Sequence, residues 1–321
     1  MTDLHAGWYL LAFTSAITEE LTPVTVGDRR LMIVRSEGAD GPAFQVADST
    51  CPHRGANLAI GGSVRGNCVV CPFHGRLIRV GTHPTRPSVQ AYDTVHIGEL
   101  LFVRFGDDAL GDNGFPDAIR RLTTGREIRP AVDRAVDVPV EFVVENAFDI
   151  EHFPTVHGVP SLQGMVTERA ADGTLSIGGD FVTMADPWYD LRYRKAAADY
   201  LGGSGSRAAH RSAFRAVAFS PTVVATSFGS GTGDPIILTG ALPTPDGTQV
   251  RVAVIGDAGQ PLDYIVDGSR LAISQDSVVW ANLDPDATWD LGPEDVNVVA
   301  FRDFVAQFPL APARRRQGAR V

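Results

Sequence analysis

Two short segments of this sequence each pair a cysteine with a histidine, and they constrain the chain more than any other feature. They are Cys51-Pro52-His53-Arg54 and Cys71-Pro72-Phe73-His74-Gly75. Two thiolates and two imidazoles can hold a [2Fe-2S] cluster, with the cysteines on one iron and the histidines on the other. Zinc is the alternative, because Cys2His2 is also a tetrahedral zinc set. Zinc fingers usually group two cysteines before two histidines, however, whereas here the two residue types alternate.

Together the two segments resemble the Rieske motif, C-x-H-x17-C-x2-H. Glycines at positions 55, 61, 62 and 75 lie where Rieske loops turn tightly, and glycine accepts the backbone angles of such turns at little steric cost. In oxygenase-type sequences the second histidine is commonly followed by Gly-Trp, and this chain departs from them with Arg76 in the position of the tryptophan. The resemblance implies a cluster bound by Cys51, His53, Cys71 and His74.

The third cysteine, Cys68, has no partner once the other two bind iron. Rieske proteins of respiratory complexes resemble this motif but carry two extra cysteines that form a disulfide beside the cluster, and three cysteines cannot supply four. We therefore expect Cys68 to be a small, buried residue on a strand. A free, odd cysteine count also fits a reducing compartment, so we expect a cytoplasmic protein.

The composition excludes several classes of protein. With 321 residues, of which 44% are hydrophobic and 21% charged, the chain is an ordinary globular protein long enough for two domains. No stretch approaches the roughly 18 consecutive apolar residues of a membrane helix. The N-terminus lacks a basic segment followed by an apolar run, so no secretory signal is expected. The net charge of −10 argues against a nucleic-acid partner.

The first part of the chain is rich in β-formers between turn residues. We expect strands at 8–13, 30–35, 43–47 and 100–105, forming an antiparallel sandwich with the cluster loops at one tip. A connector rich in Asp, Gly, Asn and Pro follows at 106–116. The predicted Rieske domain therefore spans residues 1–115, and a second domain spans 116–321.

The second domain begins with residues 137–146, which we expect to form a strand running towards a helix. On that helix Asp149 and His152, three residues apart, would share a face with Glu145. His157 is five residues beyond His152, so a regular helix would rotate it away. Pro154 would bend or end the helix and let His157 return to the same point. Taken alone, two histidines at this spacing favour partly buried structural residues over a metal site.

Beside a Rieske motif, the run D-x2-H-x4-H resembles the mononuclear iron signature of Rieske non-haem iron oxygenases. A 2-His-1-carboxylate triad holds Fe(II) by three ligands and leaves positions open for O2 and substrate. The resemblance implies that His152 and His157 are two of the ligands. It gives Asp149 a different role, bridging the cluster histidine of one subunit to an iron-ligand histidine of its neighbour.

The third ligand in the family lies late in the domain, on a long helix, in a segment resembling Q-D-x3-W. This chain offers Gln275-Asp276 with Trp280, on a run at 263–283 with helical spacing of apolar residues at 264, 271, 278 and 281. We therefore expect Asp276 to be the carboxylate ligand. Asp284 and Asp286 flank Pro285 and are typical of a solvated turn.

Between the two metal-binding segments the sequence is mostly sheet. We expect strands at 223–228, 236–242 and 249–255, the last two joined by a hairpin turn at Asp246-Gly247. Helices at both ends of an antiparallel sheet indicate an α+β domain, consistent with the helix-grip catalytic domain of the family. Residues 189–212 are expected to be a flexible loop near the substrate or an ordinary insertion, and 314–320 a solvated tail.

Taken together, the resemblance implies the terminal oxygenase component of a Rieske non-haem iron system. Such a protein uses O2 to hydroxylate or oxidatively dealkylate a small organic substrate, and the short single subunit is more typical of homotrimeric monooxygenases than of dioxygenases. No flavin or nicotinamide motif is present, so a separate ferredoxin, a separate NAD(P)H-dependent flavin reductase, or both must supply electrons. The alternative is a Rieske electron-transfer protein without oxygenase activity.

Overall fold

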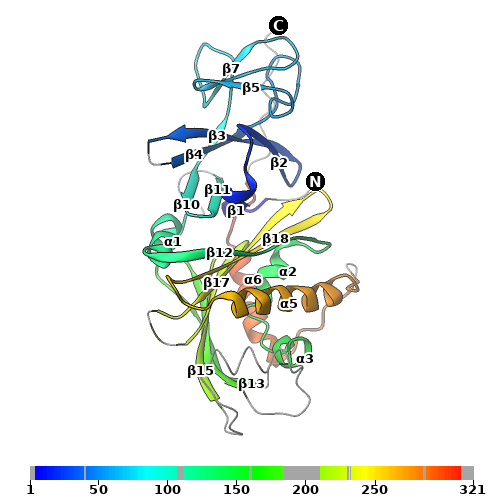
Figure 1. Cartoon of the computed structure of the whole chain (residues 1–321). Coiled ribbons are helices and arrows are strands. Elements are labelled where there is room, and N and C mark those ends of the chain that lie inside the picture. The colour runs from blue at the N-terminus through cyan, green and yellow to red at the C-terminus, as the bar shows by residue number, and fades with distance from the viewer. Residues whose placement is uncertain are drawn as a thin grey trace. The chain divides into compact units, whose positions relative to one another are not determined.

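A computed structural model describes residues 4–39, 41–106, 112–158, 161–183, 210–229, 231, 233–284 and 287–311 (Figure 1). The chain divides into two compact units. Unit 1 comprises residues 1–110, 242–246 and 309–321, and unit 2 comprises 111–241 and 247–308. The domain limits predicted from the sequence, 1–115 and 116–321, stay a prediction. The expected loop at 189–212, as far as residue 209, and the basic tail lie outside the described residues.

Unit 1 is built from short strands in three small sheets, with sheet orders β1-β11-β10, β2-β3-β4-β9 and β5-β6-β7-β8. The strands are β1 (Gly7–Phe13), β2 (Leu21–Val26), β3 (Arg29–Gly38), β4 (Gly41–Asp48), β5 (Ser63–Arg65), β6 (Cys68–Val70), β7 (Leu77–Val80), β8 (Ser88–Val89), β9 (Ala91–Tyr92), β10 (Thr94–Ile97) and β11 (Leu100–Phe105), with one 3-10 turn η1 (Thr14–Ala16) after β1. The four strands predicted here are confirmed. The pairs are antiparallel except β7 with β8.

The central strand β3 explains why the cluster region has a core of its own. Successive side chains of a strand point to opposite faces of the sheet. Leu31 and Ile33 therefore enter one hydrophobic core with β1 and β11, while Met32 and Val34 enter a second core with the two motif cysteines. Because both faces are covered, this strand is apolar at four successive positions. The cluster loops are thus held by the opposite face of the same strand that anchors the rest of unit 1.

Unit 2 contains a seven-stranded antiparallel sheet in the order β12-β18-β17-β16-β15-β14-β13. Its strands are β12 (Arg126–Val136), β13 (Ser161–Arg169), β14 (Leu175–Thr183), β15 (His210–Ser220), β16 (Val223–Phe228), β17 (Ile236–Thr244) and β18 (Gly247–Asp257). Its helices are α1 (Phe115–Thr123), α2 (Val140–Glu145), α3 (His152–Val156), α5 (Asp263–Trp280), η2 (Pro293–Asp295) and α6 (Val296–Val305). The fold is α+β, as predicted, and the expected strands and hairpin between β17 and β18 are present.

One sequence prediction in unit 2 is wrong, because residues 137–146 do not form a strand. The strand β12 ends at Val136, and α2 begins at Val140 after Pro139 in the N-cap position. Val140, Val143 and Val144 are buried, and this spacing of three and four residues matches one face of a helix. Their β-branched side chains favour a strand locally, but burying all three on one side of a helix against the core prevails.

The long helix α5 packs against β12 and β18, and Figure 1 shows it lying across the sheet. Its buried residues follow spacings of three and four, and they are Val266, Ser269, Ile273, Asp276 and Trp280. The prediction of a helix here is confirmed, but the predicted apolar face is wrong, since Val278 is 67% exposed. Packing against β12 and β18 instead buries the face on which Asp276 lies.

Candidate metal centres

The two cluster loops of unit 1 fold in the same way. In the first loop Cys51 N–H donates to Ala56 O at 2.8 Å, and Gly55 N–H donates to Cys51 O at 2.9 Å. In the second, Cys71 N–H donates to Arg76 O at 2.8 Å, and Gly75 N–H donates to Cys71 O at 2.9 Å. Each turn closes through a glycine in the left-handed region, with φ of +77° at Gly55 and +63° at Gly75. A side chain there would be strained, which explains these two motif glycines.

The paired turns bring the four predicted cluster ligands together. Cys51 and Cys71 are each 2% exposed and their thiols are hydrogen-bonded to each other. His53 and His74 are exposed, with ring centroids 4.8 Å apart. Two buried sulfur atoms behind two solvent-facing imidazoles fit the asymmetric ligand set of a Rieske cluster. Cys68 begins β6 but is half-buried rather than buried.

The environment of the two thiols differs in its effect on their protonation. Burial raises the pKa of the Cys51 thiol. Burial also opposes ionisation of Cys71, but backbone hydrogen bonding at Phe73, the thiol of Cys51 and the charge of Arg76 outweigh it, so the pKa of Cys71 is lowered. A lowered thiol pKa favours the thiolate form, which is the metal ligand.

In unit 2, His152 begins the short helix α3 and His157 follows its last residue, so this short helix places the two imidazoles close together. The structure contradicts the expected bend at Pro154. The helix is interrupted earlier, between Glu145 and His152, and Pro154 lies in the first turn of α3, where a proline is tolerated. His157 follows as the C-cap residue of α3. The two imidazole centroids are 4.9 Å apart.

Asp276 completes a three-residue group with these histidines. The ligand atoms of His152, His157 and Asp276 all lie within 4.8 Å of one another. The Nε2 atom of His157 is 3.2 Å from Oδ1 of Asp276. Metal–ligand bonds of about 2.1 Å place two adjacent ligands at right angles about 3 Å apart, so this separation suits a single ion. Of the two alternative carboxylates, Asp284 is exposed and is not part of this group, and Asp286 lies outside the described residues.

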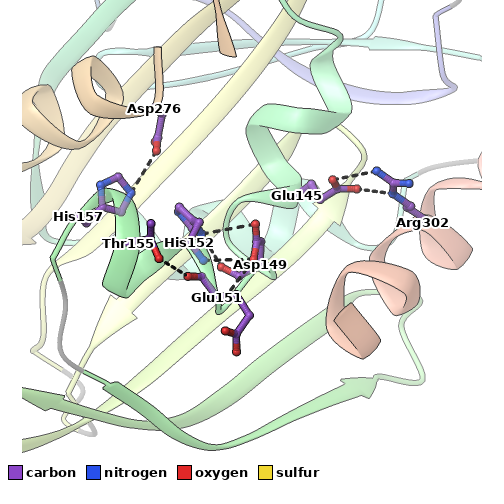
Figure 2. Close-up of polar contacts among 8 residues, drawn as sticks. All are labelled: Glu145, Asp149, Glu151, His152, Thr155, His157, Asp276 and Arg302. Atoms are coloured by element: carbon purple, nitrogen blue, oxygen red, sulfur yellow. Dashed lines mark hydrogen bonds and ion pairs between the residues drawn. The ribbon is translucent and has the colours of Figure 1, made fainter. Parts of the chain in front are cut away.

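Hydrogen bonds orient both imidazoles, and Figure 2 shows the one between His152 and Asp149. Nδ1 of His152 bonds to the backbone oxygen of Asp149, and Nδ1 of His157 lies 3.1 Å from Oε1 of Gln275. Both partners are oxygen acceptors, so each Nδ1 carries the proton and each Nε2 keeps its lone pair for a metal. The role of Gln275 was not predicted from the sequence, although it directly precedes Asp276 on α5.

Burial and the neighbouring carboxylate act on the two histidines in opposite senses. Burial, reinforced by the charge of His157, lowers the pKa of His152. At His157 burial is outweighed by the hydrogen bond and charge of Asp276, so the pKa of that imidazole is raised. Two histidines with one buried carboxylate form the donor set of a 2-His-1-carboxylate site for Fe(II).

Asp149 lies beside this group with its carboxylate directed at the start of α3. Its Oδ1 accepts hydrogen bonds from the backbone N–H of Glu151 at 3.1 Å and of His152 at 3.3 Å (Figure 2). The carboxylate is about one-third exposed, at 34%. Its predicted role towards a neighbouring subunit stays a prediction.

Comparisons with known proteins agree with these two centres. Residues 7–92 match the model of the Rieske [2Fe-2S] domain. A cholesterol 7-desaturase of Hemicentrotus pulcherrimus is 28% identical over 168 residues, covering 47% of this chain and 35% of the desaturase. The oxygenase component of dicamba O-demethylase of Stenotrophomonas maltophilia is 26% identical over 240 residues, covering 62% of this chain and 67% of that protein. The match thus spans about a third of the length of the desaturase.

Solved structures share the fold at low sequence identity. Dicamba monooxygenase bound to 3,6 dichlorosalicylic acid superposes with a TM-score of 0.69 and 18% identity, covering 95% of this chain and 97% of that chain. A mutant of NdmA from Pseudomonas putida CBB5 with theobromine gives a TM-score of 0.67 and 15% identity, covering 94% and 89%. None of the helices formed by the described residues is long and apolar enough to cross a membrane. The chain thus contains a Rieske [2Fe-2S] domain and, on the fold that it shares with dicamba monooxygenase, a largely buried His/His/Asp group, and in both features it is similar to the terminal components of Rieske non-haem iron oxygenases.

Proposed function

We propose that this chain is the terminal oxygenase component of a Rieske system that hydroxylates or oxidatively dealkylates a small organic substrate. The observation that carries the proposal is the presence of two separate ligand sets in one chain, the Cys51/His53/Cys71/His74 loops and the His152/His157/Asp276 group. A Rieske electron-transfer protein needs only the first set. The chain's relatives include demethylase and desaturase proteins, which supports an oxidative reaction.

The residues of unit 2 would hold Fe(II) through Nε2 of both histidines and a carboxylate oxygen of Asp276. When bound, the cluster supplies electrons one at a time and the mononuclear iron supplies the site for O2 activation. Gln275 and the Asp149 carbonyl hold the two Nδ1 protons, which keeps both Nε2 atoms turned to the metal. The ring of Phe153 packs on both histidines, at centroid distances of 4.4 Å to His152 and 5.8 Å to His157, and so excludes water from one side.

Electrons would reach this site from a neighbouring subunit in a homotrimer. Asp149 would orient the cluster histidine of that neighbour, as carboxylates commonly do for metal-bound imidazoles. The partial exposure of its carboxylate leaves room for such a contact. A separate ferredoxin, flavin reductase, or both would donate the electrons. We also keep the prediction of a cytoplasmic protein, which three cysteines without disulfides support.

The test is reconstitution of the purified chain with iron and sulfide, followed by turnover with a surrogate ferredoxin and reductase. We expect a red-brown protein with two cluster irons and one mononuclear iron per chain. In a screen of sterols, aromatic ethers and N-methyl compounds, O2 should be consumed in the presence of one class. Mass spectrometry with 18O2 should then show that one labelled oxygen atom is incorporated per turnover, either in a hydroxylated product or in the one-carbon product released on dealkylation. The Asp276→Ala variant serves as the control without the second site.

The outcomes separate the competing functions. A colourless protein that holds zinc at Cys51 and Cys71 would refute both the oxygenase and the electron carrier. A red-brown protein that binds no third iron and never consumes O2 would support the electron carrier. Two labelled oxygen atoms in the product would keep the oxygenase but reject the monooxygenase.

A further inference from the structure

An ion pair on the outer side of the metal-binding turn joins α2 to α6. The guanidinium of Arg302 binds the carboxylate of Glu145 through two bonds, Nε to Oε2 at 2.7 Å and Nη2 to Oε1 at 3.1 Å (Figure 2). Such a two-point contact fixes orientation as well as distance. The Glu145 side chain is 12% exposed and that of Arg302 is 33% exposed. Burial raises the pKa of Glu145, and Arg302 opposes that effect.

Aromatic rings hold the arginine of this pair in place. The Arg302 guanidinium carbon lies 3.6 Å from the ring centroid of Trp289, a close cation–π contact. Phe142 of α2 packs edge-on against the same indole, with centroids 5.2 Å apart. Since Trp289 is 43% exposed, it contributes little to the core. Its described contacts serve Arg302 and α2.

The backbone of Glu145 connects this pair to the metal site. Its carbonyl oxygen accepts the N–H groups of Phe148 at 2.7 Å and Asp149 at 3.0 Å. The carbonyl of Asp149 in turn accepts the Nδ1 proton of His152, and the Asp149 carboxylate accepts the His152 backbone N–H. Each of these steps is a direct hydrogen bond, so a shift of Glu145 moves the imidazole of His152.

The break between helices α2 and α3 explains why the metal-binding turn needs the support of the Glu145–Arg302 ion pair. Residues 146–151 lie between α2 and α3 and lack a continuous ladder of helical hydrogen bonds. Apolar packing holds one point of this turn, where the rings of Phe148 and Phe301 stack with centroids 5.1 Å apart. A second point is needed to fix its rotation, and the Glu145–Arg302 pair provides it, because Arg302 directly follows Phe301 on α6 and Glu145 lies three residues before Phe148.

From this chain of contacts we propose that Glu145, Arg302 and Trp289 are positioning residues that set the orientation of His152 and Asp149 in the mononuclear iron site. This inference rests on the proposed function only in requiring that His152, His157 and Asp276 hold Fe(II). The three residues do not touch the metal ligands directly. They act through the backbone of Glu145 and of Asp149.

The experiment measures Fe(II) binding to the whole protein with its cluster in place. Equilibrium dialysis gives the dissociation constant of the mononuclear iron, and the S = 3/2 EPR signal of the Fe(II)–NO adduct reports its ligand geometry. Loss of a supporting contact around a metal site typically weakens metal binding by about 10- to 100-fold. We expect Arg302→Met to weaken Fe(II) binding by about that factor and to broaden the EPR signal, with the cluster spectrum unchanged.

Three further variants separate positioning from loss of fold. Arg302→Lys keeps the positive charge but cannot make the two-point contact of a guanidinium, so its Fe(II) binding should be intermediate. The double variant that exchanges the two residues, Glu145→Arg with Arg302→Glu, should recover part of the Fe(II) binding. Trp289→Ala leaves the ion pair and should have the smallest effect. Arg120→Met is the matched control, because it removes an exposed pair with Asp117 at 3.0 Å on α1 of the same unit, and it should bind Fe(II) like the wild type.

The results that would overturn the proposal are specific. Wild-type binding and EPR signals in Arg302→Met, or in both Arg302→Lys and Trp289→Ala if Arg302→Met does not fold, would exclude a positioning role. If the wild-type protein binds no Fe(II), or if Asp276→Ala binds Fe(II) as tightly as the wild type, the proposed function is refuted and this inference with it.

Discussion

The Nε2 atom of His157 lies 3.2 Å from Oδ1 of Asp276, and both side chains are almost fully buried, at 5% and 7% exposure. With Nδ1 of the imidazole directed to Gln275, the facing Nε2 and carboxylate oxygen can be joined only by a proton or a metal ion. This contact joins the segment after α3 to the core-facing side of α5. It makes Asp276 a member of the candidate iron site together with His152 and His157.

Removal of this carboxylate should empty the mononuclear site and leave the cluster intact. We expect Asp276→Ala and His152→Ala to lose turnover and one iron per chain, because a facial triad keeps only two ligands in either variant. Iron analysis and the visible spectrum of the cluster check this. An Asp276→Ala protein that keeps its iron and activity would show that another carboxylate, such as Asp284, is the ligand.

Loss of the Gln275 amide should lower the Fe(II) affinity of the site without abolishing binding. Gln275→Leu keeps the size of the side chain but removes the acceptor of the His157 Nδ1 proton, so the imidazole can rotate. We expect Fe(II) affinity to fall by about 10-fold or more. Ser274→Ala is the control, since the Ser274 hydroxyl donates to the Leu271 carbonyl at 2.7 Å within α5. Equal Fe(II) affinity in the two variants would contradict the role of Gln275.

Asp149→Asn should separate reduction of the cluster from oxidation of the substrate. The amide keeps the size of the carboxylate but loses the charge that would hold a neighbour's imidazole. We expect normal iron content, a cluster that is still reduced by a reductase, and little product in rapid-mixing experiments. A variant with undiminished product formation, or a wild-type monomer that turns over fully, would rule out the proposed route between subunits.

The partly buried hydroxyl of Tyr92 should make unit 1 sensitive to alkaline pH. Burial and the nearby Asp48, which accepts its hydrogen bond at 3.0 Å, raise the pKa of Tyr92 to about 12. The neutral form is thus favoured in the folded state, and the stability due to Tyr92 is complete below pH ~10 and lost as pH rises to ~12. The stability difference between wild type and Tyr92→Phe, measured by urea unfolding, should shrink by up to ~2 kcal/mol over this range. A constant difference would contradict the assignment.

Gly268 offers a way to stabilise α5 without touching the site. A Cβ at this position would meet no atom within 4 Å, and the residue lies in the helix interior. Alanine in place of glycine in a helix contributes about 0.8–1 kcal/mol. We expect Gly268→Ala to raise the free energy of unfolding by roughly this amount with unchanged Fe(II) binding. Gly62→Ala is the opposite control, because its Cβ would clash with the backbone oxygen of Leu58, and it should be strongly destabilising.

The local motifs of this chain were predictable because their geometry depends on residues close in sequence. The turns at Gly55 and Gly75 orient each cysteine with its histidine through bonds spanning five residues or fewer. His152 and His157 lie on one short helix and its C-cap. The strand segments of unit 1 and the hairpin before β18 likewise follow from β-formers and turn residues in sequence.

Contacts between distant segments were decided only by the tertiary structure. The sequence indicated α5 but not which of its faces would be buried, nor that Gln275 would bond to His157. It favoured a strand where α2 forms, and it contained no sign of the pairing between Glu145 and Arg302. Local propensities differ by less than about 1 kcal/mol per residue, whereas burying one large apolar side chain contributes about 2–3 kcal/mol. The packing of the whole unit therefore determines which side chains meet, and with them the support of the iron site.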